Sequence, residues 1–424
     1  MIKVFNKIIP TIVLTLIITS CGGGGGGGGS DSPTPPATPA ATSSISLSSE
    51  KGYVGGTVTV TWSSTNATSC TASNAWTGTK GTSGSETFSL EGAGSFTFEI
   101  SCSGSGGSGS ASATLKVFQY DKQTDDVTNK TWDAEGFATI LEGIAGWVTS
   151  FDYSGEDSTN LLTVTAFEPS DSSFELDYSG STEGGNSFDF SLVFNDWNTS
   201  TTLLYDPDDT ENAAYALIRA TYADAVVDGF LTLPDYYSNQ GIDYVSSALV
   251  EIFTSPTYYL IPTNVGEFTE TDDVPSSGTS SKTFDTLGYY YEASVDGGNI
   301  YNGYIVADGQ GTLDFDFSNN TVGGSFTYDT FAPYTSFKEG NATYNLITQI
   351  PEQTITLQNG TISDNSFIAQ IVIDDGETTG SGLIKGHFYG PNADEIAVNI
   401  ILLDNDDNEN DFFIFTAGGI GQTQ

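Results

Sequence analysis

The side chains of this chain that could do chemistry are mostly carboxylates, because it has 54 Asp and Glu residues but one His and three Cys. This composition cannot supply the multi-His or multi-Cys ligand sets that hold most transition metals. The single histidine, His387, could serve a Ser-His-Asp relay only beside a serine nucleophile, and no Gly-x-Ser-x-Gly elbow precedes a helix in the sequence. We therefore expect His387 to be structural, and we predict no catalytic residue and no enzymatic activity.

Clusters of carboxylates remain as candidates. Asp404, Asp406 and Asp411 are separated by Asn and further acidic residues and could offer oxygen ligands to Ca²⁺. The stretch lacks the glycine and the terminal Glu of an EF-hand loop, so we favour an acidic, solvated hairpin tip and expect no obligatory cofactor. Paired carboxylates could also hydrolyse glycosides, but pairs arise by chance among so many acids. A carbohydrate-active hydrolase is the least favoured hypothesis.

Tyrosine clusters could contact a ligand. Tyr236, Tyr258 and Tyr290 each have a tyrosine neighbour in the sequence. Neighbouring side chains of a strand point to opposite faces, so one ring of each cluster would be exposed. Exposed tyrosines favour contacts with proteins or sugars, which makes these three residues candidate ligand-binding positions. The alternative is that the rings only form the aromatic edges of the folded domains.

The body that positions these residues is strongly acidic, with a formal net charge of −43. Residues 1–119 hold five basic and five acidic residues, whereas the rest of the chain holds six basic and 49 acidic residues. Charge of this sign repels phosphate backbones, which argues against nucleic acid as a partner. The step in charge indicates two bodies that are joined near residue 120.

The N-terminus has the pattern of a secretion signal. Lys3 and Lys7 precede an apolar run at residues 8–18, which is shorter than the about 20 apolar residues that span a bilayer. The run ends in Ile-Thr-Ser-Cys, which resembles the lipobox of bacterial lipoproteins. This resemblance implies a signal peptide at residues 1–20 and a lipid on Cys21 that anchors the chain to the outer membrane. The alternative is an ordinary signal with a chance Cys.

Residues 21–44 are rich in Gly, Pro and Ser and would form a flexible tether. Residues 45–118 alternate apolar and polar side chains in short runs, which is typical of a β-sandwich. Within them, Cys70 and Cys102 would form a disulfide in an oxidising compartment, with two buried thiols as the alternative. This part resembles bacterial Ig-like modules of cell-surface proteins, which implies a spacer. We expect Cys70 to lie in a loop that follows the strand of Trp62.

The distal part also has the pattern of strands. In residues 313–317, apolar side chains alternate with Asp314 and Asp316, and many such runs with one apolar face suit a closed antiparallel barrel. Side chains would fill the interior of a small barrel. Residues 212–227 are Ala-rich, and we favour a strand over a helix there. The predicted fold class is all-β: an Ig-like sandwich, a β-rich handle-like domain over residues 119–270 and an antiparallel barrel over residues 271–424.

A family resemblance rests on three segments of the predicted barrel. Residues 274–278, residues 311–325 and the run Gly-His-Phe-Tyr-Gly-Pro-Asn-Ala-Asp-Glu-Ile at residues 386–396 resemble the barrel of transferrin-binding protein B and related surface lipoproteins. The resemblance implies a lipid-anchored protein on the outer face of the outer membrane. Members of this family capture host metal-carrier proteins, haem or complement regulators. The chain departs from the pattern in having one handle and barrel, and in having Val398 where the family has Gly.

These observations predict a lipid-anchored cell-surface protein that captures an extracellular protein, haem or another nutrient through barrel and handle loops. The acidic surface would prefer a basic partner. The alternative is a structural or adhesive envelope lipoprotein with no specific soluble ligand.

Overall fold

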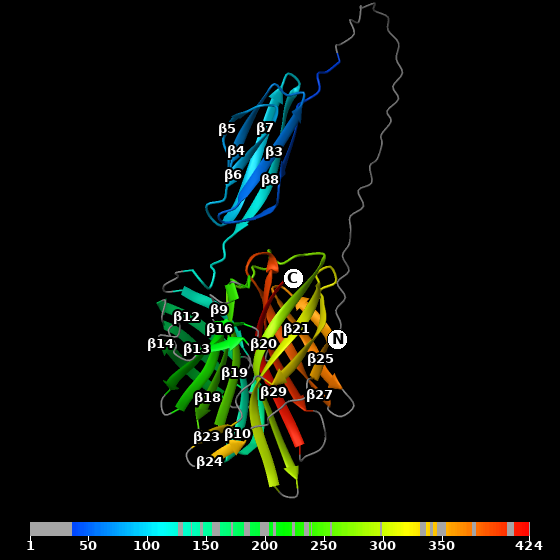
Figure 1. The fold of residues 1–424 in the computed structure, drawn as a ribbon. Helices are drawn as coiled ribbons and strands as arrows, with labels where there is room; N and C mark the ends of the chain where they lie inside the picture. Colours follow the sequence, from blue (N-terminus) through cyan, green and yellow to red (C-terminus); the bar gives the residue numbers. More distant parts are fainter. Residues whose placement is uncertain are drawn as a thin grey trace, which may run out of the picture. The chain divides into compact units, whose positions relative to one another are not determined.

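The computed structural model describes residues 36–423 of the chain, except for residues 126–129, 137, 145–146, 155–161, 171–172, 182–186, 196–202, 207–208, 223–224, 233–236, 239, 255–256, 297–298, 331–335, 340–341, 346–352, 375–378 and 405–410. Nearly all described elements are strands, as the sequence predicts (Figure 1). No helix among these residues is long and apolar enough to cross a membrane.

The first strands form a β-sandwich of two sheets. One sheet has the order β1 (Thr42–Leu47), β3 (Thr57–Thr65) and β6 (Ser83–Ser89). The other has the order β2 (Lys51–Tyr53), β8 (Gly107–Phe118), β7 (Gly94–Gly104), β4 (Ser69–Asn74) and β5 (Gly78–Lys80). On β3 the side chains of Val58, Val60 and Trp62 are buried while the intervening threonines reach the surface. The alternation of the sequence therefore sets which face of the strand is buried.

Cys70 and Cys102 form a disulfide with 4.0 Å between their Cα atoms. The expectation that Cys70 lies in a loop is wrong, because it lies in β4, where Cys70 and Ala72 are buried and Thr71 is exposed. Since β4 and β7 are neighbours in one sheet, the bond joins two adjacent strands.

The next strands form an 11-stranded sheet that we call the handle. Its main path is β14 (Ser187–Asn195), β13 (Ser173–Ser181), β12 (Leu162–Ser170), β9 (Lys130–Gly136), β19 (Thr257–Gly266), β18 (Val245–Thr254), β17 (Ala225–Thr232), β16 (Asp209–Tyr222) and β15 (Leu203–Asp206). β10 (Ala138–Ile144) pairs with β19 and with β11 (Trp147–Ser154). Residues of β13 and β14 share one buried cluster with residues of β17, β18 and β19, so the two halves of the sheet pack face to face.

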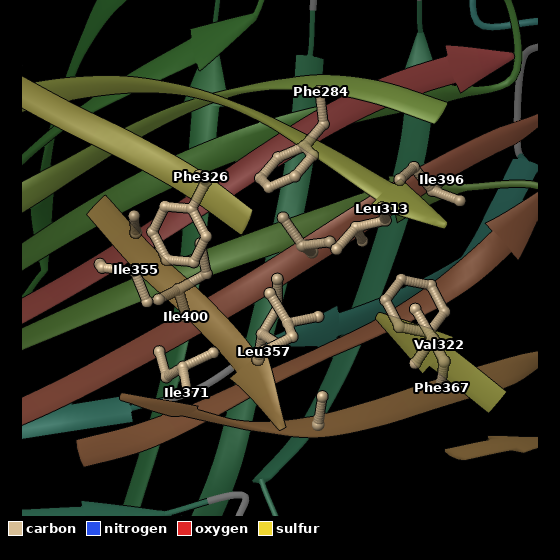
Figure 2. Packing of buried hydrophobic residues seen from close by; sticks show 14 of the residues in the cluster. Phe284, Leu313, Val322, Phe326, Ile355, Leu357, Phe367, Ile371, Ile396 and Ile400 are labelled. Carbon is tan, nitrogen blue, oxygen red and sulfur yellow. The ribbon is translucent and has the colours of Figure 1, made fainter. Parts of the chain in front are cut away.

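Eight strands close into an antiparallel barrel in chain order. They are β20 (Thr279–Asp296), β21 (Asn299–Asp316), β22 (Thr321–Thr330), β25 (Gln353–Ser363), β26 (Ser366–Asp374), β27 (Thr379–Tyr389), β28 (Glu395–Asp404) and β29 (Asp411–Thr423). Between β22 and β25, β23 (Ser336–Glu339) pairs with β24 (Ala342–Asn345). Inward side chains such as Phe284, Leu313 and Phe326 fill the interior (Figure 2). The sequence-based prediction of a filled antiparallel barrel is confirmed.

The two ends of the barrel differ, because successive antiparallel connections alternate between them. At one end, which we call the turn end, residues 317–320, 364–365 and 390–394 join neighbouring strands. At the opposite end, the loop end, strands are joined through residues 297–298, 331–352, 375–378 and 405–410. Asp316 closes the first short turn, since its Oδ1 accepts hydrogen bonds from the backbone N–H groups of Ser318 and Asn319 at 2.9 and 3.1 Å.

Candidate functional site

The loop end is the candidate binding surface, because the ends of several acidic strands meet there. β20 ends at Asp296, β26 ends at Asp374, β28 ends at Asp404 and β29 begins at Asp411. The register places Asp411 opposite Ser294 of β20, two residues before Asp296. Four of the eight barrel strands therefore have an aspartate as their terminal residue at this end.

The handle extends toward the same end. Asn264 of β19 donates a hydrogen bond from Nδ2 to the carbonyl oxygen of Val398 at 3.0 Å, near the start of β28. The other end of β19 pairs Thr257 with Thr254 in a hairpin. This hairpin is seven residues, or about 23 Å of extended strand, from Asn264. Handle and barrel thus both present connections at the loop end.

The three candidate tyrosines are not in one place. Tyr258 is the second residue of β19, next to the hairpin at the loop end, and Tyr290 lies in β20 opposite Phe415. Tyr236 lies outside the described residues, while its neighbour Tyr237 is buried with Ile420 and Tyr389 at the turn end. The structure therefore gives two of the three tyrosines strand positions nearer the loop end, and the side chains of both lie outside the described part.

The Ca²⁺ candidates Asp404 and Asp411 flank the same connection of the barrel, and Asp406 lies within it, outside the described residues. Among the residues that the structure describes, no group of three His, Cys, Asp or Glu side chains could hold a metal ion. The proposed lipidation site, Cys21, also lies outside the described residues.

The turn end contains buried ionisable residues that sequence reasoning missed. Glu395, at the start of β28, is 3% exposed, and its two carboxyl oxygens accept the backbone N–H groups of Asp243 and Tyr244 at 2.7 and 2.8 Å. These two residues belong to the connection that leads into handle strand β18. Burial raises the pKa of Glu395 to about 8. The acidic residue of the late turn motif therefore attaches the handle to the barrel.

A buried lysine lies at the same end. Lys282 is 1% exposed, and its Nζ donates to the carbonyl oxygen of Asp394 at 2.9 Å and to Oγ1 of Thr423 at 2.6 Å. Burial lowers the pKa of Lys282 to about 8, while the nearby Asp394 and Glu395 act in the opposite direction. Nearby, Lys122 pairs with Asp243 at 2.6 Å, and Lys130 pairs with Asp121 and Glu267. Three of the six basic residues of the distal part are thus paired or bonded at the turn end.

His387 connects handle and barrel. Its Nδ1 is 2.6 Å from Oε2 of Glu135 in handle strand β9, and its ring stacks on Phe268 with 4.2 Å between centroids. Glu135 is 6% exposed. His387 therefore contacts the ring of Phe268 and the carboxyl group of Glu135, which belong to two other segments. The sequence signal that could have found this role is the position of His387 inside the turn motif, one residue before Phe388 of the barrel core.

The chain was compared with known families and structures. Residues 274–418 match the family model of the C-lobe and N-lobe β-barrels of transferrin-binding protein B. No curated protein matches the chain.

Similar solved structures include a mutant of transferrin-binding protein B from Haemophilus parasuis, with 10% identity over 78% of this chain and 83% of that chain and a TM-score of 0.31. The haemoglobin receptor HpuA from Kingella denitrificans has 12% identity over 72% of this chain and 89% of that one, with a TM-score of 0.31. Transferrin-binding protein B from serogroup B Neisseria meningitidis has 13% identity over 87% of this chain and 63% of that one, with a TM-score of 0.30.

The matched residues include all three segments that suggested the family, at residues 274–278, 311–325 and 386–396, and they cover most of the closed barrel. The resemblance predicted from the sequence is confirmed. The closed barrel of this chain is similar to the β-barrels of transferrin-binding protein B over residues 274–418.

Proposed function

We propose that this protein is a non-catalytic lipoprotein, anchored through Cys21 to the outer face of the outer membrane, that captures an extracellular ligand at the loop end. The observation that carries the proposal is the gathering of strand-terminal aspartates at one end of the barrel. Asp296, Asp374, Asp404 and Asp411 terminate four of its eight strands at the loop end. An acidic rim attracts a basic partner and accelerates its encounter.

The filled barrel supports binding at the rim over binding in a pocket. The buried cluster of the described residues occupies the interior from Phe284 to Ala417. A carbohydrate-active hydrolase would need two carboxylates about 5–10 Å apart in a cleft. Two buried carboxylates that the structure describes, those of Glu135 and Glu395, instead contact His387 and backbone N–H groups.

The proteins named with the similar structures bind transferrin and haemoglobin. These two proteins are therefore the first probes. We would immobilise the full chain and measure the binding of human transferrin, human haemoglobin and lysozyme, which serves as an unrelated basic protein. We expect micromolar or tighter binding of transferrin or haemoglobin, and a stronger effect of salt than on a neutral interface.

A variant with Asp296→Asn, Asp374→Asn, Asp404→Asn and Asp411→Asn should weaken this binding at least tenfold. The matched control is Asp314→Asn, because Asp314 is an exposed aspartate of β21 close to the turn end. Equal affinity of both variants would refute binding at the loop end. Absence of binding by every probe would favour the structural or adhesive alternative.

The location is tested separately. Brief protease treatment of intact cells should release the soluble part by cleavage within residues 22–41 if the protein faces outward. Retention of the full-length chain under conditions that cleave a known surface protein would place it in the periplasm.

A further inference from the structure

The hairpin of β20 and β21 leaves a strand edge open at the loop end. The two strands pair over their whole length without a register shift. β21 has 18 residues, and ten of them, residues 307–316, also pair with β22. The other eight, residues 299–306, extend past β22 (Figure 1), and we call them the free edge. Among the described residues no strand pairs with this side of β21, and the strands that follow β22, β23 and β24, pair with each other.

The free edge offers hydrogen-bonding groups of the backbone. Eight extended residues span about 27 Å, and alternate residues of a strand direct their N–H and C=O groups to the same side. The free edge therefore has about four donors and four acceptors on the side that β22 leaves uncovered. An added strand is the partner that satisfies all of these groups together.

Two other strand edges of the molecule are protected, in contrast to this one. The five-stranded sheet of the sandwich ends in β2 and β5, which have three residues each and contain Lys51 and Lys80. Short length and lysine are means by which natural edge strands avoid pairing with other chains. The free edge has the sequence Asn-Ile-Tyr-Asn-Gly-Tyr-Ile-Val, without a charged residue or a proline. It therefore keeps the capacity to accept another strand.

The charge around the free edge indicates the chemistry of its occupant. Asp296, at the end of β20, pairs with Asn299, the first residue of the free edge. Asp308 follows the last residue of the free edge by two positions, and the register places it opposite Asp329 of β22. Acidic residues thus stand at both ends of the free edge, which favours a basic partner. A second copy of this chain would be repelled, because each copy has a net charge of −43.

We propose that the free edge binds an extended, basic segment of a partner protein, about eight residues long, which adds a strand to β21. This inference rests on the proposed function, because it specifies how the loop end holds its ligand. Backbone hydrogen bonds along β21 supply the contact, and the acidic residues at its two ends select basic side chains.

The first test is hydrogen exchange of the backbone amides of the full chain alone. Alternate amides within residues 299–306 should exchange at least tenfold faster than the amides of residues 307–316, which have a paired strand on both sides. Slow exchange of every amide of residues 299–306 would show that this chain or a second copy already covers the edge, and would overturn the proposal.

The second test uses a synthetic octapeptide of alternating Lys and Val. We expect it to bind the full chain and to slow the exchange of the fast amides of the free edge, while residues 307–316 stay unchanged. Two control peptides separate the contributions. The same peptide with Glu in place of Lys should bind at least tenfold more weakly. A Lys-Val peptide with N-methylated backbone keeps its charge but loses donors, so it should also bind at least tenfold more weakly. Equal affinity of the methylated peptide, or protection confined to other residues, would overturn the proposal.

The failure of this inference can be told apart from the failure of the proposed function. Transferrin or haemoglobin bound at the loop end without protection of the free edge would overturn the added strand and leave the proposed function standing. Protection of the free edge by the Lys-Val peptide, without binding of either protein, would support the added strand and count against these two proteins as ligands.

Discussion

The two ends of the barrel use the same residue type in opposite ways. At the turn end, Glu395 is buried and bonded to two backbone N–H groups, and Asp316 closes a four-residue turn. At the loop end, Asp296, Asp374, Asp404 and Asp411 stand at strand termini. Carboxylates thus serve attachment and turn formation at one end, while at the other the strand-terminal aspartates belong to the proposed contact surface.

The largest expected effect is at Glu395. Glu395→Ala would leave the N–H groups of Asp243 and Tyr244 without an acceptor, which costs about 3 kcal/mol. The midpoint of thermal unfolding of the distal part should fall by about 6 °C or more, measured by calorimetry on the full chain. The control Asp314→Ala, at an exposed strand position, should change it little. Equal midpoints for the two variants would mean that the handle does not depend on this contact.

A pH titration sharpens the same comparison. Burial raises the pKa of Glu395 from 4.5 to about 8, so between these values the folded chain retains a proton that the unfolded chain has lost. The free energy of unfolding should therefore fall as the pH rises through this window. Burial also raises the pKa values of Glu267 and Asp394, so the difference in the free energy of unfolding between wild type and Glu395→Gln isolates this residue. The free energy of unfolding of wild type minus that of the variant should decrease from pH 5 to pH 8 and then level off. A difference that does not change with pH would contradict the raised pKa.

Asp316 should have a smaller effect. Hydrogen bonds from Asn319 and Ser318 hold the pKa of Asp316 below its ordinary value. Asp316→Ala should lower the unfolding midpoint by only a few degrees, because the carboxylate is exposed to solvent. The contribution of Asp316 to the free energy of unfolding should also weaken as the pH falls below about 4. The contribution of Glu395 changes in the opposite direction, because it weakens as the pH rises. A loss as large as that of Glu395→Ala would show that the turn, and not the buried attachment, limits stability.

The smallest effect on stability is expected at the loop end. The variant with all four strand-terminal aspartates changed to Asn should unfold within about 1–2 °C of wild type, because surface substitutions change stability by about 0.5 kcal/mol or less. The same variant should lose binding, as proposed above. A large fall in its midpoint would show that these carboxylates are part of the folded framework.

Much of the fold was predictable because strand alternation is a local property. Leu313, Phe315 and Phe317 are buried, while Asp314 between them is exposed. Cys70 shows the limit of predicting strands from alternation. Its strand is short and has a polar residue at every second position, so Ser-Cys-Thr-Ala resembles a loop. Only the pairing with β7 identifies it as a strand.

The attachment of the handle could not be predicted in the same way. Glu135 and His387 are about 250 positions apart in the chain, and nothing in the alternation of either strand specifies that they meet. Asn399 and Thr416 likewise look like ordinary outward residues of barrel strands. Only the packing of a second sheet onto β28 and β29 makes them buried.

The short turns at 317–320, 364–365 and 390–394 fix the pairing of three hairpins from one side of the barrel. Insertions or exchanges of sequence on the other side can therefore lengthen a connection without shifting which residues pair within those hairpins. An ancestral barrel of this kind could acquire a new specificity by successive changes to its connections alone, each one tolerated by an unchanged scaffold.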